Sequence, residues 1–189
     1  MASSLFYGEI RHTEATIFRL FRTQYRSFCQ RRMLARFLLG LAMVFTAVFT
    51  HFPDLLRFIL LILGAWFMVS LDFPGQMNAD KSLEARRGML PTMTYTFYND
   101  EMRITGEGDL TMKYAKLIRL AQDAEYLYLF SGPEAVCMID RSTVKPDDEK
   151  LVAFLAEKTG LEWKTNKSFF LLNLYDLLQI LRKTAGRKK

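Results

Sequence analysis

Histidine and cysteine are scarce in this chain of 189 residues, which contains two of each. His12 and His51 lie before and at the end of an apolar run that is long enough to cross a membrane, so they are expected on opposite sides of a bilayer and cannot form the paired ligands of a zinc site or an acid–base pair. Cys29 and Cys137 form no CxxC pair, which disfavours a disulfide framework and predicts two free thiols. These absences disfavour zinc chemistry and thiol redox chemistry.

Motifs for phosphate binding and nucleophilic catalysis are also missing. Residues 106–108 read Gly-x-Gly but lack the further glycine and the following helix that cradle a phosphate, so they predict a hairpin turn. Ser131 precedes a glycine without a GxSxG elbow, and neither cysteine has a neighbouring histidine to activate it. Asp147, Asp148 and Glu149 suggest a divalent-cation site, but acidic residues at a helix start are typical of dipole stabilisation. We expect no enzyme active site, no metal and no cofactor.

Two long apolar runs, residues 33–52 and 55–71, dominate the sequence. Each carries one full charge, Arg36 or Arg57, near its beginning, where a long side chain can reach the lipid headgroups. The Leu, Ile, Val and Phe side chains of each run favour bilayer insertion by about 3–5 kcal/mol. The connection around Pro53 permits only a tight turn, so residues 33–72 are predicted to form a two-helix transmembrane hairpin. A soluble helical hairpin buried in a globular core is the alternative, because the charge-free cores are short.

Basic residues flank the two runs on the same side, while the intervening turn offers only Arg57, offset by Asp54. Because Lys and Arg are retained on the cytoplasmic side, the chain is predicted to be a multi-pass protein of the cytoplasmic (inner) membrane with both termini inside. The net charge of +6 then has a topological explanation. The lipid bilayer is thus an expected partner, and nucleic acid is not.

Residues 1–32 are predicted to form a cytoplasmic strand near residues 6–10 and a basic amphipathic helix from about Thr13. This helix suits the inner leaflet, and it equally suits packing of its aromatic stripe on the protein's own soluble domain. Basic side chains here and near the C-terminus are the candidates for contact with anionic lipid: Arg19, Arg22, Arg26, Arg31, Arg32, Arg182 and Lys183.

A change of pattern follows the hairpin. Residues 73–90 are predicted to be a linker, with a loop over residues 72–80 and a short charged helix over residues 81–88. From residue 91 short alternating runs predict an antiparallel meander of about six strands, at residues 94–98, 102–105, 110–114, 116–120, 125–130 and 135–139. Residues 147–158 predict a closing helix that Gly160 ends.

The run TYTFYNDEMRITGEGDLTMKYAKLIRLAQDAEYLYLFSGPEAVCMIDRSTV, residues 94–144, resembles the YcxB-like family of small bacterial membrane proteins. The likeness extends more loosely over residues 6–163. It implies a pleckstrin-homology-like (PH-like) antiparallel β-sandwich or partial barrel over residues 91–163, and it implies no catalytic residue. The expected fold class is therefore an α+β membrane protein, in which a transmembrane hairpin carries a PH-like domain capped by a C-terminal helix.

Residues 164–189 are predicted to form an amphipathic helix, over residues 168–182, and a basic tail. Its broad apolar face must bury against the domain, the membrane surface or a partner subunit, including a second copy of the chain. We expect a non-enzymatic, membrane-tethered binding or scaffold module that presents its domain to a protein partner. A sensor of anionic lipid headgroups is the alternative, and an enzyme with an unrecognised site is a third class.

Overall fold

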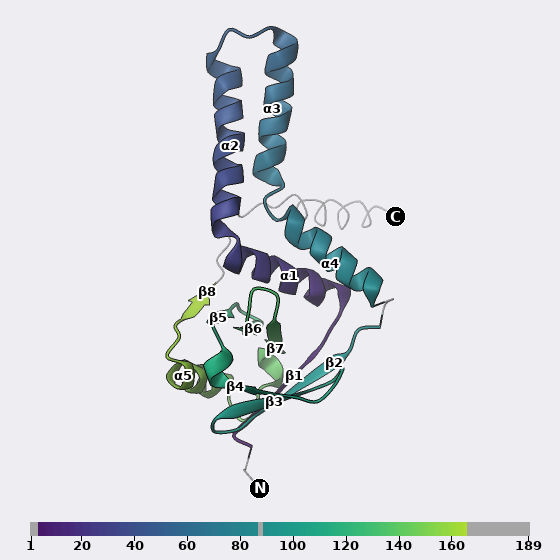
Figure 1. The fold of residues 1–189 in the computed structure, drawn as a ribbon, viewed down its shortest axis with the longest axis vertical. Coiled ribbons are helices and arrows are strands. Elements are labelled where there is room, and N and C mark those ends of the chain that lie inside the picture. Colours follow the sequence, from purple (N-terminus) through teal and green to yellow (C-terminus); the bar gives the residue numbers. More distant parts are fainter. Residues whose placement is uncertain (1–3, 87–88, 166–189) are drawn as a thin grey trace, which may run out of the picture. The chain divides into compact units, whose positions relative to one another are not determined.

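The computed structural model describes residues 4–86 and 89–165 and has an α+β fold (Figure 1). The chain divides into two compact units. We call the described residues 4–24, 78–86 and 89–165 the β-unit, and residues 25–77 the helical unit. The boundaries fall within helices α1 (Glu14–Phe28) and α4 (Phe73–Ala85). The helical unit is therefore an insertion in the sequence of the β-unit.

Two four-stranded sheets form the β-unit. The first is antiparallel, in the order β1-β2-β3-β4, and its strands are β1 (Phe6–Arg11), β2 (Thr92–Phe97), β3 (Glu101–Thr105) and β4 (Leu110–Lys113). The second has the order β7-β6-β5-β8, and its strands are β5 (Arg119–Gln122), β6 (Tyr126–Phe130), β7 (Val136–Asp140) and β8 (Trp163–Thr165). Strand β8 pairs in parallel with β5, while the other pairs are antiparallel. Short 3-10 turns follow β4 and β7, η1 (Tyr114–Lys116) and η2 (Arg141–Thr143).

The N-terminal strand β1 belongs to the first sheet, because Phe6 pairs with Phe97 and Arg11 with Thr92. The strand predicted near residues 6–10 is therefore confirmed, but the sequence did not predict its pairing with β2. Its alternating pattern buries one face, and a Cβ at Gly8 would lie 2.8 Å from the Ile139 side chain of the second sheet. A long-range pairing of this kind leaves no local signal beyond the alternation.

Helix α5 (Asp148–Thr159) closes the β-unit and confirms the helix predicted over residues 147–158. Asp147 caps it by accepting a hydrogen bond from the Glu149 amide at 3.0 Å, and Gly160 ends it in the left-handed conformation at φ 64°. Its buried side chains, Leu151 and Leu155, join a core made mainly by both sheets. Members of that core include Tyr95, Phe97, Met102, Leu120, Leu127, Tyr128, Leu129, Phe130, Met138 and Ile139.

Each of the six predicted strands has a counterpart, but their arrangement as one meander is wrong, because β1 and β8 add to two separate sheets. The boundary between the third and fourth predicted strands is also shifted. Tyr114 turns inward in η1, where its hydroxyl donates to the carbonyl oxygens of Tyr98 at 2.7 Å and Glu101 at 3.0 Å. Strand β4 therefore ends before this buried tyrosine, and β5 begins only at Arg119.

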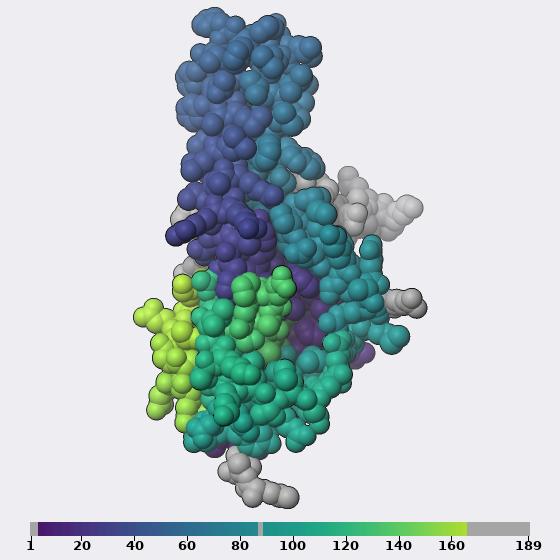
Figure 2. Space-filling model, in the orientation of Figure 1, coloured from purple at the N-terminus to yellow at the C-terminus, as the bar shows by residue number. Residues whose placement is uncertain are grey.

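In the helical unit, α2 (Gln30–Phe49) and α3 (Asp54–Val69) run side by side (Figure 1), and Figure 2 shows their side chains in contact along the pair. Gly40 and Gly64 are buried where the two backbones meet. By length and composition α2 can span a membrane. Helix α3 has 16 residues and reaches spanning length only together with α4, from which it is bent by 60°.

The loop predicted over residues 72–80 is wrong, because helix α4 begins at Phe73; the helix predicted over residues 81–88 is confirmed as far as Ala85, and residues 87–88 lie outside the described residues. Pro74 lies in the first turn of α4, where its missing N–H removes no hydrogen bond, so it starts the helix rather than breaking it. Just before α4, Asp72 is buried and accepts hydrogen bonds from the Arg26 guanidinium, one of them 3.1 Å long between Nε and Oδ1.

Candidate functional site

The candidate lipid-binding arginines that the structure describes fall in both units. Arg19 lies in the β-unit, where its Nε is 3.1 Å from Asp123 Oδ2 and its Nη1 is 2.5 Å from Glu125 Oε2. Its guanidinium carbon also lies 4.7 Å from the centre of the Tyr126 ring. The charge of Arg19 is thus engaged by the β5–β6 turn, which competes with contact to lipid.

The remaining candidates have different surroundings. Arg22 is half-buried, and Arg26 is held by Asp72. Arg31 and Arg32 are exposed in the first turn of α2. Arg182 and Lys183 lie outside the described residues.

Asp123, the partner of Arg19, is itself held in place by hydrogen bonds, and this fixes the position of the Arg19 guanidinium. Its carboxylate accepts hydrogen bonds from the amides of Glu125 and Tyr126, each 2.9 Å long, and from the Tyr128 hydroxyl at 2.8 Å. Burial, followed by the nearby charge of Asp123, raises the pKa of Tyr128 and keeps that hydroxyl protonated as a donor. The network joins α1 to the β5–β6 turn and has a structural role.

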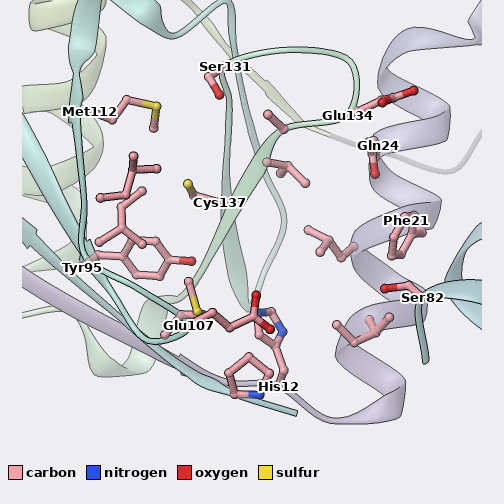
Figure 3. Close-up of a pocket in the computed structure, with 18 of the residues that line it drawn as sticks. His12, Phe21, Gln24, Ser82, Tyr95, Glu107, Met112, Ser131, Glu134 and Cys137 are labelled. Carbon is pink, nitrogen blue, oxygen red and sulfur yellow. The ribbon is translucent and has the colours of Figure 1, made fainter. Parts of the chain in front are cut away.

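A cavity of about 360 Å³ lies within the β-unit and is a candidate ligand site. It lies between one face of α1 and the first sheet, with the β6–β7 connection and the end of α4 completing its walls (Figure 3). Most of the wall is apolar. The apolar lining residues are Ile17, Leu20, Phe21, Pro91, Met93, Ile104, Leu110, Met112, Ala135 and Val136.

One end of the cavity is polar and contains His12, Arg86 and Glu107 (Figure 3). Arg86 and Glu107 form an ion pair. Burial, with a further contribution from the positive charge of Arg86, lowers the pKa of His12, and Glu107 only partly opposes this. The imidazole is therefore neutral at pH 7, and its Nδ1 lies 3.5 Å from the Thr16 hydroxyl oxygen.

The other end of the cavity is formed by Gln24, Ser131 and Glu134 (Figure 3). The Gln24 side-chain amide donates to the Pro133 carbonyl oxygen at 2.6 Å, which joins α1 to the β6–β7 connection. Glu134 is exposed at this end. Two polar ends therefore enclose an apolar middle.

Tyr95 and Cys137 contribute polar groups to the middle of the wall (Figure 3). Burial raises the pKa of the Tyr95 hydroxyl, and it raises the pKa of the Cys137 thiol to about 12. A thiol with that pKa is protonated at pH 7 and is not an activated nucleophile. Both cysteines are free thiols, as the sequence predicts.

Sequence reasoning missed this cavity because its lining comes from distant segments: α1, the end of α4, β2 to β4, and the β6–β7 connection. The one feature of the sequence that indicates the cavity is the stripe of aromatic and aliphatic side chains on α1, which includes the half-buried Leu20 and Phe21. That stripe was compatible with packing on the protein's own domain, and the structure places Ile17, Leu20 and Phe21 on the cavity.

No model of a known protein family, no curated protein and no solved structure matches this chain. The resemblance of residues 94–144 to the YcxB-like family therefore stays a prediction. Within residues 4–86 and 89–165, His, Cys, Asp and Glu side chains form no group of three that could hold a metal ion. The cavity itself can enclose a small apolar body between two polar ends.

Proposed function

We propose that this chain is an integral membrane protein whose helices α2 and α3 cross the bilayer as a hairpin and hold the β-unit in the cytoplasm as a non-enzymatic binding module. One observation carries the proposal: large apolar side chains are exposed around both helices. Phe49 is 72% exposed, Leu55 74% and Phe58 63%. Leaving such a side chain in water forgoes about 1.5–3 kcal/mol relative to burial, and lipid removes that cost. Further exposed members are Leu34, Leu38, Leu39, Phe45, Val48, Leu56, Ile59, Leu61, Ile62, Leu63, Trp66 and Val69.

The length of the helices is compatible with a bilayer. At about 1.5 Å per residue, α2 is about 30 Å long and α3 about 24 Å, against a hydrocarbon core of about 30 Å. The shortfall of α3 is accommodated by local thinning of the bilayer and by Arg57, whose charged head can reach the headgroups. Arg57 Nε also donates to the Ala47 carbonyl oxygen at 3.1 Å, which ties the ends of α3 and α2 together near the turn.

Charge supports the orientation. Arg31, Arg32 and Arg36 lie in the first two turns of α2, at the end of the pair away from the connecting turn. At the turn, Arg57 lies 3.7 Å from Asp54, which offsets its charge. The excess of positive charge at the end away from the turn favours placing that end in the cytoplasm.

Two sheets closed by α5 support assigning the β-unit to the PH-like sandwiches or partial barrels, and this assignment supports membership of the YcxB-like family. A binding role is favoured over catalysis because the Cys137 thiol is protonated and Arg86 is bound to Glu107, so neither is free to act as a nucleophile or as an electrostatic catalyst. Cavities of this size with polar groups at their ends are typical of ligand sites.

The membrane part of the proposal is tested by comparing Ile62→Arg, in the middle of α3, with Leu55→Arg, near its start. Both positions are exposed, at 53% and 74%. In lipid, arginine at mid-helix costs about 2.5–3.5 kcal/mol of insertion free energy, and near the end it costs little. The expected result is that the unmodified chain and Leu55→Arg stay in membranes washed with alkaline carbonate, whereas the membrane-bound fraction of Ile62→Arg falls sharply. Release of the unmodified chain, or equal behaviour of the two variants, would contradict it.

Recognition of anionic headgroups is the second candidate, favoured by the exposure of Arg31 and Arg32 at the start of α2. It is distinguished by hydrogen exchange on the full chain in nanodiscs with and without anionic lipid. Lipid recognition predicts that anionic lipid protects the first turn of α2, that salt removes this protection, and that Arg31→Gln/Arg32→Gln abolishes it. Identical exchange in both lipids leaves these arginines as topological signals.

A further inference from the structure

The cavity of the β-unit sets limits on what it can hold. Its volume of about 360 Å³ lies at the lower end of the range for small-molecule sites, which is about 300–1,000 Å³. A folded macromolecule cannot enter such a space. The ligand must therefore be small, or be a short chain.

The walls determine the body of that ligand. Ile17, Leu20 and Phe21 of α1 face the cavity from one side, and Met93, Ile104 and Met112 of the first sheet line the other. Two of the lining residues are methionines, whose flexible thioethers adapt to an apolar guest of variable shape. An apolar tail fits this middle section.

The charged residues of the lining indicate which head group the ligand carries. Arg86 supplies one positive charge to the lining, and Glu107 and Glu134 supply two negative charges, so the balance of +1 and −2 is −1. Arg86 and Glu107 pair at the end near His12, which leaves that end close to neutral. Glu134, at the rim of the cavity on the side of Gln24, is the negative centre that a guest would meet at the other end (Figure 3).

We propose that the cavity binds a small amphiphile with a cationic head and a short apolar tail, the head lying at Glu134 and the tail between α1 and the first sheet. This assignment rests on the proposed role of the β-unit as a binding module and names the class of its ligand. It predicts weaker binding of fatty acids and other anionic amphiphiles, which would place a second negative charge beside Glu134.

The test uses the full chain in nanodiscs, labelled with ¹³C at the methionine methyl groups. Met93 and Met112 line the cavity, whereas Met102 and Met138 are buried in the core outside its lining and serve as internal controls. The probes are hexyltrimethylammonium and hexanoate, which share a short tail and differ in the sign of the head. The expected result is a saturable shift of the Met93 and Met112 signals with the ammonium probe, and binding of hexanoate at least about tenfold weaker.

Two variants locate the effect. Glu134→Gln is expected to weaken binding of the ammonium probe about fivefold, as one unit-charge interaction in water-like surroundings at an exposed glutamate implies, while the matched variant Glu149→Gln, an exposed glutamate on α5, leaves binding unchanged. Val136→Trp fills the cavity and is expected to abolish binding, with unchanged Met102 and Met138 signals showing that the fold is kept.

Absence of any shift at Met93 and Met112 with either probe would overturn the proposal, and so would equal or tighter binding of hexanoate. Loss of binding in Glu149→Gln to the same extent as in Glu134→Gln would also overturn it. These outcomes are independent of carbonate extraction, which reports only on α2 and α3. Failure of the ligand assignment and failure of the membrane proposal are thus distinguishable.

Discussion

The contact between Gly40 and Gly64 gives the sharpest prediction for the helical unit. A Cβ at Gly40 would lie 2.7 Å from the Gly64 carbonyl oxygen, and a Cβ at Gly64 would lie 2.8 Å from the Gly40 carbonyl oxygen. Both obstacles are backbone atoms, which cannot rotate away. Replacing either glycine by valine must therefore push α2 and α3 apart along this section.

The magnitude follows from two opposing effects. Overpacking of a close contact costs about 1–3 kcal/mol, and the lost packing of Met68 and Phe67, which also lie beside Gly40, adds to it. Valine gains only about half a kcal/mol of helix propensity over glycine. Gly40→Val should therefore lower the free energy of unfolding of the helix pair by about 1–2 kcal/mol. Ala42→Val in the same helix is exposed and should change it by less than about 0.5 kcal/mol.

The assay is reversible unfolding of the full chain in mixed micelles by increasing fractions of sodium dodecyl sulfate. Trp66 of α3 provides the fluorescence signal, after Trp163→Phe removes the only other tryptophan of the chain. Because Gly40 and Gly64 occupy the same contact, the double valine variant should cost less than the sum of the single variants. A Gly40→Val variant as stable as Ala42→Val would refute the close backbone contact.

Three further predictions concern the β-unit. The pKa of His12 is lowered in the folded chain, so its contribution to stability is complete above about pH 7 and declines as the pH falls below the ordinary histidine value of about 6.5. His12→Asn should therefore flatten the pH dependence of the thermal unfolding temperature between about pH 7 and 5. An unchanged pH dependence would contradict this. Asp147→Ala should lower the free energy of unfolding by about 1 kcal/mol by removing the cap of α5, and Asp147→Asn should largely retain it, as chemical denaturation of the β-unit would show. Tyr114→Phe should cost about 1 kcal/mol, because the part-buried carbonyl oxygen of Tyr98 loses its donor, whereas that of Glu101 keeps the hydrogen bond from the Tyr98 amide; an effect below about 0.5 kcal/mol would show that the Tyr98 oxygen is satisfied otherwise.

Local signals predicted most of the elements. The alternation around Phe6, the acidic start of α5 and the stop at Gly160 each depend on residues close in sequence, and each prediction matches an observed element. The pairing of β1 with β2 could not be predicted, because partners such as Phe6 and Phe97 are separated by the whole helical unit. The pairing of β8 with β5 is also long-range, since β6, β7 and α5 lie between them in the chain. Pro74 does not distinguish a loop from a helix start, since proline suits both a loop and the first turn of a helix.

The candidate site was harder to predict than the fold. Arginine side chains such as Arg19 and Arg26 are visible in the sequence as basic residues, but their acidic partners Asp123 and Asp72 lie far along the chain. Single-sequence reasoning counts charge without knowing which charges are paired. The cavity escaped for the same reason, because no individual segment contains both its apolar walls and its polar ends.

Accessibility labelling in sealed cells tests the central claim most directly. The variants are His51→Cys, exposed in the turn between α2 and α3, and Lys150→Cys, exposed on α5, each in a chain with Cys29→Ser and Cys137→Ser. If α2 and α3 cross the bilayer with the β-unit inside, a membrane-impermeant maleimide labels His51→Cys in intact cells and labels Lys150→Cys only after permeabilisation. Labelling of Lys150→Cys in intact cells, or recovery of both variants in the soluble fraction, would contradict the account.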